Sequence, residues 1–157
     1  MSDFTPHSVS PYLVCANAKE AIAFYCQAFG AQQLLTINTA DGGILHATLK
    51  INGSSMMLTE QNPEYQGASH MSLGDSPVTI HLVVEDVDAA MHQAQQAGAT
   101  VTMEPAEMFW GDRFGCLKDP FGHTWSMSTP VRNMSEAEIQ RAANLMMASK
   151  TQNEDNT

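Results

Sequence analysis

Residues 108–126 read MFWGDRFGCLKDPFGHTWS and contain both tryptophans of the chain. Inside this stretch, the letters DPFG at 119–122 predict a tight turn, because proline fixes φ, aspartate can bond the amides that follow it, and glycine accepts a positive φ. The flanks of the turn, residues 113–117 and 123–128, read as strands. The stretch therefore predicts a β-hairpin, and the rest of the chain is interpreted around it.

Trp110 and Arg113 stand among glycines at the entrance to the first strand of this hairpin. An aromatic ring and a cation in such a place more often line a pocket than fill a core. Arg113 has a second interpretation, in which it pairs with Asp112 and clasps the loop. Both interpretations stay open at this point, and Trp110 and Arg113 are candidate ligand contacts.

The hairpin closes a β-α-β-β-β pattern that occurs twice in the chain. In the second copy, a strand over 78–84 is followed by Asp86 as a helix N-cap, an apolar stripe at helical spacing and Gly98 at the helix end. In the first copy, Asn17 and Gly30 take the matching places, at the same interval within one residue. Two copies of one unit indicate that each half needs the other to bury its apolar face.

The predicted fold class is α+β, with two β-α-β-β-β units that form a cupped mixed sheet and a C-terminal helix added to them. Ser135 as N-cap and Glu138 three residues later predict the start of that helix. The expected divisions are a flexible tail at 1–8, the first unit at 9–60, a connecting loop at 61–77, the second unit at 78–130, the helix at 134–149 and a disordered tail at 150–157. The third strand of the second unit is expected to begin at 113, after a short strand over 100–103.

The composition excludes several classes of function. The 157 residues carry 7 Lys and Arg against 17 Asp and Glu, a net charge of −10, so binding to nucleic acid or to an anionic membrane is not expected. No apolar run approaches the roughly 18 residues of a spanning helix, and the first ten residues lack the pattern of a signal peptide. The three cysteines, Cys15, Cys26 and Cys116, form no CxxC motif, which favours reduced thiols in a cytoplasmic protein.

The paired units, together with FWGDR at 109–113 and DPFGHTW at 119–125, resemble the PhnB-like branch of the glyoxalase/bleomycin-resistance/dioxygenase superfamily, also called the vicinal oxygen chelate proteins. The resemblance covers about residues 9–130. It implies that each unit supplies half of a cupped sheet, that two units enclose a small-molecule cavity, and that the protein is a homodimer.

Metal-dependent members of the superfamily hold a divalent ion with His, Gln or Glu side chains from the first and last strand of each unit. Carried over to this sequence, the four positions fall at Ser10, Met57, Thr79 and Ser126. Hydroxyl groups are weak ligands for a transition metal, and a thioether is softer still. The resemblance therefore implies a cup without a catalytic metal or other cofactor, and it counts against a metal-dependent glyoxalase.

Strand alternation predicts which side chains face the cup. The faces expected to line it combine hydroxyls, imidazoles and apolar groups, a mixture that suits a ligand pocket, although a wet inner face without a ligand is the plainer alternative. His46 and His81 are either neutral rings with hydrogen-bond partners or, with an acid within reach, general bases. The predicted ligand-binding residues are Tyr12, His46, Met57, Thr79, His81, Trp110, Arg113 and Ser126.

Three classes of function remain open. The first is a protein that binds a small organic molecule without a metal. The second is a lyase, isomerase or dioxygenase of glyoxalase type that uses a divalent metal, and the third is a dimeric scaffold with a vestigial cup. No nucleophile elbow, phosphate loop or dinucleotide fingerprint is present to favour another kind of enzyme.

Overall fold

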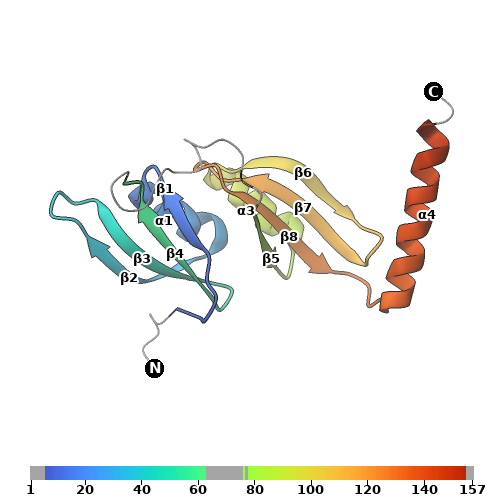
Figure 1. Ribbon diagram of the computed structural model, residues 1–157, viewed down its shortest axis with the longest axis horizontal. Coiled ribbons are helices and arrows are strands. Elements are labelled where there is room, and N and C mark those ends of the chain that lie inside the picture. Colours follow the sequence, from blue (N-terminus) through green and yellow to red (C-terminus); the bar gives the residue numbers. More distant parts are fainter. Residues whose placement is uncertain (1–5, 63–75, 77, 155–157) are drawn as a thin grey trace.

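Each half of the chain folds into a four-stranded mixed sheet with one helix on one face (Figure 1). The computed structural model describes residues 6–62, 76 and 78–154. The first unit consists of β1 (Tyr12–Cys15), α1 (Ala18–Phe29), β2 (Gln32–Asn38), β3 (Ile44–Ile51) and β4 (Ser54–Glu60). The second unit consists of β5 (Thr79–Val83), α3 (Val87–Ala97), β6 (Thr100–Glu107), β7 (Asp112–Lys118) and β8 (Thr124–Pro130), and α4 (Glu136–Glu154) follows it. The predicted fold of two β-α-β-β-β units with an added helix is confirmed.

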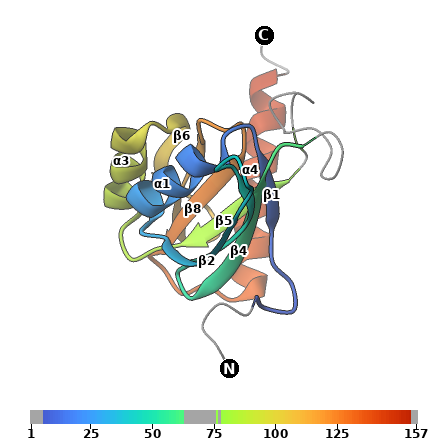
Figure 2. The same cartoon turned by 90° about the vertical axis from the view of Figure 1, so that its left-hand side faces the viewer.

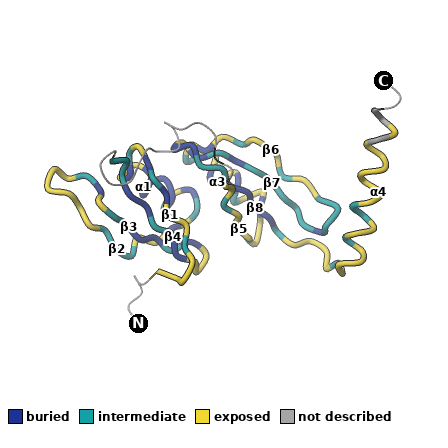
Figure 3. The backbone as a smooth tube through the Cα atoms, viewed as in Figure 1, coloured by how far each residue is buried: buried dark blue, intermediate teal, exposed yellow. Residues whose placement is uncertain are grey.

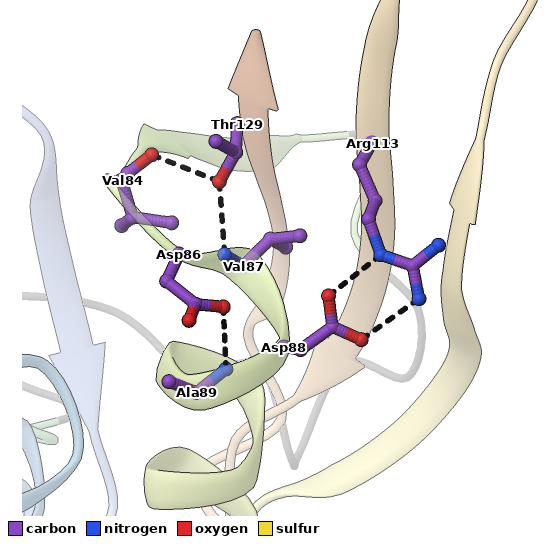
Figure 4. Close-up of polar contacts among 7 residues, drawn as sticks. All are labelled: Val84, Asp86, Val87, Asp88, Ala89, Arg113 and Thr129. Carbon is purple, nitrogen blue, oxygen red and sulfur yellow. Dashed lines mark hydrogen bonds and ion pairs between the residues drawn. The ribbon is translucent and has the colours of Figure 1, made fainter. Parts of the chain in front are cut away.

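The predicted helix caps form as expected. The side chain of Asn17 accepts a hydrogen bond from the Glu20 amide at 3.1 Å, and the side chain of Asp86 accepts one from the Ala89 amide at 3.0 Å (Figure 4). Gly30 ends α1 in the left-handed conformation, with φ of 65°, which residues with a Cβ adopt only with strain. The local sequence therefore determines where both helices begin and end.

The strand order is the same in both sheets, β1-β4-β3-β2 and β5-β8-β7-β6. In each sheet, the first strand of the unit lies at an edge and runs parallel to the last strand, while the other pairs are antiparallel. Strand β6 continues to Glu107, four residues beyond the expected end at 103, although it contains Pro105. A register shift between Met103 and Ala106 accommodates this proline, which has no amide hydrogen to give to the ladder.

Strand alternation gives each sheet a face covered by helices and an open face. On the helix side, Leu58 and Trp125 have no exposed surface. On the open side, Tyr12 is 43% exposed and Val83 is 58% exposed, and the tube in Figure 3 shows long exposed stretches on both sheets. In the part of the chain that the structure describes, each unit thus buries one side of its sheet and leaves the other uncovered.

The two units share one core. Helices α1 and α3 pack side by side (Figure 2), and rings from both units meet, with Phe24 against Phe121 and Phe29 against Trp125. At the centre, the buried carboxylate of Asp119 accepts bonds from the hydroxyl of Tyr25 at 2.7 Å and from the indole of Trp125 at 2.9 Å. The predicted 119–122 turn is therefore also the clasp that joins the units.

Helix α4 projects from the end of the second unit (Figure 1). The predicted capping box is present, since Ser135 donates its amide to Glu138 at 2.7 Å and accepts from the Glu138 amide at 3.3 Å. The helix runs to Glu154, beyond the expected end at 149. Most of the expected connecting loop at 61–77, and the first and last residues of the chain, lie outside the described residues. Within the described part of the chain, no helix is long and apolar enough to cross a membrane.

Candidate functional site

The open face of the first sheet brings together three of the predicted ligand contacts. The hydroxyl of Tyr12 lies 3.1 Å from Nδ1 of His46, and the two rings meet edge to face. Nε2 of the same imidazole lies 3.1 Å from the Thr48 hydroxyl, so both ring nitrogens of His46 have hydroxyl partners. Met57 stands opposite both Tyr12 and Thr48 in the strand register. This group, Tyr12, His46, Thr48 and Met57, is called the first half-site.

The open face of the second sheet carries a similar arrangement around His81. Nδ1 of His81 lies 2.7 Å from the Ser126 hydroxyl, and Nε2 lies 3.1 Å from the Ser128 hydroxyl. The imidazole stacks on the Phe114 ring, with centroids 5.9 Å apart and an angle of 17° between the planes. Thr79 lies two residues before His81 on the same face of β5.

The bonding of His81 restricts its chemistry. A neutral imidazole donates from one nitrogen and accepts at the other, so one serine accepts from the ring and the other donates to it. Ser126 is 5% exposed and Ser128 is 1% exposed, which places both hydroxyls beneath the ring and away from solvent. Of the two interpretations of this histidine, the geometry favours a ring with hydrogen-bond partners, because its described contacts are two hydroxyls and a phenyl ring and include no carboxylate.

A row of aromatic rings extends the arrangement around His81. Trp110 meets Phe114 edge to face at 5.5 Å and Phe109 at 5.0 Å, so the row runs from His81 through Phe114 to Trp110. The structure therefore brings the predicted contact Trp110 close to the His81 group. Phe114 was not predicted as a site residue from the sequence. Strand alternation is the signal that could have found it, because it puts Phe114 on the face opposite to that of Arg113. The second half-site is defined as Thr79, His81, Trp110, Phe114, Ser126 and Ser128.

Arg113 lies on the other face of the same strand. It stands opposite Thr129, and its guanidinium donates two hydrogen bonds to the Asp88 carboxylate on α3, at 2.6 and 2.8 Å (Figure 4). This pairing lowers the pKa of Asp88 and raises that of Arg113. The partner is Asp88 and not the neighbouring Asp112. Successive side chains of a strand point to opposite faces, so Arg113 is not brought together with the other predicted contacts.

The two half-sites stand on separate sheets of the chain. Among the described residues, no hydrogen bond or ring contact joins the Tyr12 and His46 pair to the His81 group. Each half-site is a polar and aromatic surface, and the described residues of the chain that carries it do not enclose it.

The four positions implied for a metal do not fit a transition metal. The Ser10 hydroxyl bonds that of Ser55, and the Ser126 hydroxyl bonds His81. The remaining two positions offer the Met57 thioether and the Thr79 hydroxyl, which are poor ligands for zinc, nickel or iron. In the described parts of the chain, no group of three or more His, Cys, Asp or Glu side chains could hold a metal ion.

The cysteines offer no activated nucleophile. All three thiols are free, and Cys15 lies buried at the junction of the units. Burial, together with the charge of Asp119, raises the pKa of Cys15 to about 12, and burial also raises the pKa of Cys26 and of Cys116. A raised pKa lowers the thiolate fraction, which is the reactive form.

Comparison with known proteins agrees with this architecture. Residues 6–127 match the Glyoxalase/Bleomycin resistance protein/Dioxygenase superfamily. An uncharacterized protein from Mycobacterium bovis is 47% identical over 138 residues, which cover 86% of this chain and 91% of that protein.

Two solved structures share the fold. One is described as a putative 3-demethylubiquinone-9 3-methyltransferase, PhnB protein, from Bacillus cereus. It is 16% identical with a TM-score of 0.62, over 78% of this chain and 99% of that one. The other is the fosfomycin resistance protein FosX from Listeria monocytogenes, in complex with Mn(II) and sulfate. It is 14% identical with a TM-score of 0.61, over 87% of this chain and 98% of that one.

Proposed function

The chain belongs to the glyoxalase/bleomycin resistance/dioxygenase superfamily, and we propose that it binds a small organic molecule on the open faces of its sheets without a catalytic metal. The observation that carries this proposal is the second half-site, where aromatic rings and an imidazole stand over two serine hydroxyls on the sheet face opposite α3. The alternative, a solvated sheet face without a ligand, would not require aromatic rings in contact with one another.

The arrangement suits a planar molecule with polar edges. The Trp110 and Phe114 rings offer apolar surface for stacking, and edge-to-face or offset geometry with an aromatic ligand is favourable. The hydroxyls of Tyr12 and Thr79 can exchange hydrogen bonds with hydroxyl or carbonyl groups of the molecule. Arg113 is engaged by Asp88 on the other face, so the described half-sites favour a neutral ligand over an anionic one.

We propose further that the binding site is completed in a homodimer. Each half-site lies on a sheet face with exposed side chains, such as Tyr12 at 43% in the first sheet and Val83 at 58% in the second. Helix α4 also presents apolar side chains such as Leu145, which is 74% exposed. A second copy that faces the first would cover these surfaces and close a cavity between a first and a second half-site. Sedimentation at micromolar concentration tests this, and a species of only 17.1 kDa would contradict it.

The acidic charge supports a ligand that is neither nucleic acid nor an anionic membrane, and the three free thiols support a cytoplasmic location. The metal-dependent enzyme is the second candidate because its superfamily is the one matched, and FosX was solved with Mn(II). Elemental analysis separates the two candidates. About one equivalent of Zn, Ni, Mn or Fe per chain, retained against a chelator and lost in His81→Ala, would favour the enzyme.

The test of ligand binding is isothermal titration with 7-hydroxycoumarin, a planar molecule with polar edges, at about pH 6, where its phenol is protonated and the molecule is neutral. Trp110→Ala should weaken binding at least tenfold, or about 1.4 kcal/mol, whereas Trp110→Phe, which keeps a ring, should weaken it less. Arg113→Gln should leave binding unchanged, because the guanidinium lies on the other face. Equal affinity in the wild type and in Trp110→Ala would contradict the proposed site and favour a scaffold with a vestigial cup.

A further inference from the structure

A cleft of about 350 Å³ lies between the two units, at the outer edge of β5, a strand that pairs with β8 alone among the described strands. One wall is β5, and the other is the turn between β3 and β4 together with the start of β4. Its volume is within the range of small-molecule pockets, which form preferentially where domains meet.

The floor of the cleft is part of the shared core and not of the half-sites. Ile80, Leu82 and Trp125 belong to the helix-side face of the second sheet, and Ile51 and Met56 to that of the first. The ring of His81, by contrast, points to the open face, where it bonds the two serines. The cleft therefore reaches the edge of β5 from the helix side, and His81 is the one residue that it shares with the second half-site.

The mouth of the cleft carries polar groups of the main chain. Asn52, which has a φ of 49°, turns its side chain across the gap and donates to the Val83 carbonyl at 2.8 Å. The Val84 amide donates to the Ser128 carbonyl of the neighbouring strand at 2.9 Å. In a parallel ladder, the amide and carbonyl of one residue point to the same side of the strand, and those of the next residue point to the other side. Because Val84 bonds toward β8, the amide and carbonyl of His81 and the amide of Val83 are directed to the outer edge of β5.

The lining determines the class of ligand. Among the residues that the structure describes, none that lines the cleft is Lys, Arg, Asp or Glu. A charged group placed there would lose its hydration without gaining a counter-charge, which is strongly unfavourable. An apolar group would remove the exposed parts of the floor from water, and a hydrogen-bonding end could pair with the free main-chain groups of β5.

We propose that this cleft is a second binding site, for a small, neutral and largely apolar molecule that carries one hydrogen-bonding group. The site does not depend on ligand binding at the half-sites, because its floor belongs to the core and its polar groups belong to the edge of β5.

The two tryptophans provide a direct test in the wild-type protein. Trp125 forms the floor of the cleft and donates its indole N–H to Asp119, while Trp110 belongs to the second half-site. The probe is N-phenyl-1-naphthylamine, which is neutral and apolar and has one N–H. In ¹H–¹⁵N spectra, its addition should shift the Trp125 indole signal and the amides of His81 and Val83, and leave the Trp110 indole signal in place. A shift confined to Trp110, or no binding, would overturn the proposal.

A pair of variants gives an independent test. Leu82→Phe adds volume inside the cleft and should weaken binding of the dye by about tenfold or more. Val78→Phe adds at least as much volume four residues earlier, at a side chain that is 63% exposed and outside the lining, and this variant should bind the dye like the wild type. Equal affinities in the two variants would also overturn the proposal. Should Leu82→Phe fail to fold, the wild-type indole shifts decide the question alone, and titration with 7-hydroxycoumarin reports separately on the half-sites.

Discussion

Substituting Tyr25 by phenylalanine removes a single oxygen from the junction between the two units. Tyr25 has no exposed surface, and its hydroxyl donates to the Asp119 carboxylate at 2.7 Å. That carboxylate is 4% exposed and keeps three other donors, the Trp125 indole and the amides of Phe121 and His123. The variant therefore tests how much one hydrogen bond of this clasp contributes to stability.

The expected loss follows from the type of bond. A hydrogen bond to a charged group contributes about 1.5–3 kcal/mol to the free energy of unfolding, and the carboxylate left with one donor fewer cannot reach water easily. The substitution removes no carbon atom, so a cavity term is small. In a chain of this size, about 1 kcal/mol shifts the midpoint temperature by roughly 2–4 °C, which gives a decrease of roughly 3–12 °C for Tyr25→Phe.

Urea unfolding, followed by far-ultraviolet circular dichroism, measures the change. We expect a lower midpoint concentration with an unchanged slope, since the surface exposed on unfolding stays the same. Tyr12→Phe is the matched control. It removes the same atom from a side chain that is 43% exposed, and it should change the free energy by less than about 0.5 kcal/mol. If the two variants have equal stability, the reasoning about the Asp119 clasp is wrong.

Three further predictions concern pH, thiol reactivity and the base of α4. The pKa of Tyr25 is raised by burial and by the charge of Asp119, so its contribution to stability is complete below pH 10 and should decrease at higher pH; this decrease should be weaker in Tyr25→Phe. Cys15 should react with Ellman's reagent only on unfolding, because its pKa is about 12 and it is buried, and all three thiols reacting at one rate in the native protein would contradict this. Gly111→Ala should lower the midpoint of thermal unfolding more than Gly42→Ala does. Both glycines have a positive φ, but only at Gly111 would the new Cβ meet another group, the Arg132 carbonyl at 2.6 Å.

The same local reasoning explains how much of the fold could be predicted. Asn17 and Asp86 cap their helices through side-chain bonds to amides three residues away, and Gly30 ends α1 with a positive φ. These interactions join residues close in sequence, so the sequence alone indicates them. The exception is β6, which continues through Pro105, because a register shift that depends on pairing with β7 accommodates the proline.

The candidate site was predicted only in part, since alternation gives the face of a residue but not its partner. The sequence placed Tyr12, His46, His81 and Ser126 on the faces where the structure has them. It did not indicate that Arg113 binds Asp88, because that ion pair joins a strand to a helix 25 residues away. The proposed site depends on such faces, which the described residues of one chain leave open.

Asp119 illustrates the division between local and tertiary information. By itself, the sequence determined the turn at 119–122, since proline, glycine and an aspartate that accepts from the amides of Phe121 and His123 act within a few residues. Only the tertiary structure decided that the second carboxylate oxygen would hold Tyr25, which lies 94 residues away in the chain. Turn and cap energies depend on neighbouring residues, whereas the burial of a charge requires both units to pack around it and supply its donors together.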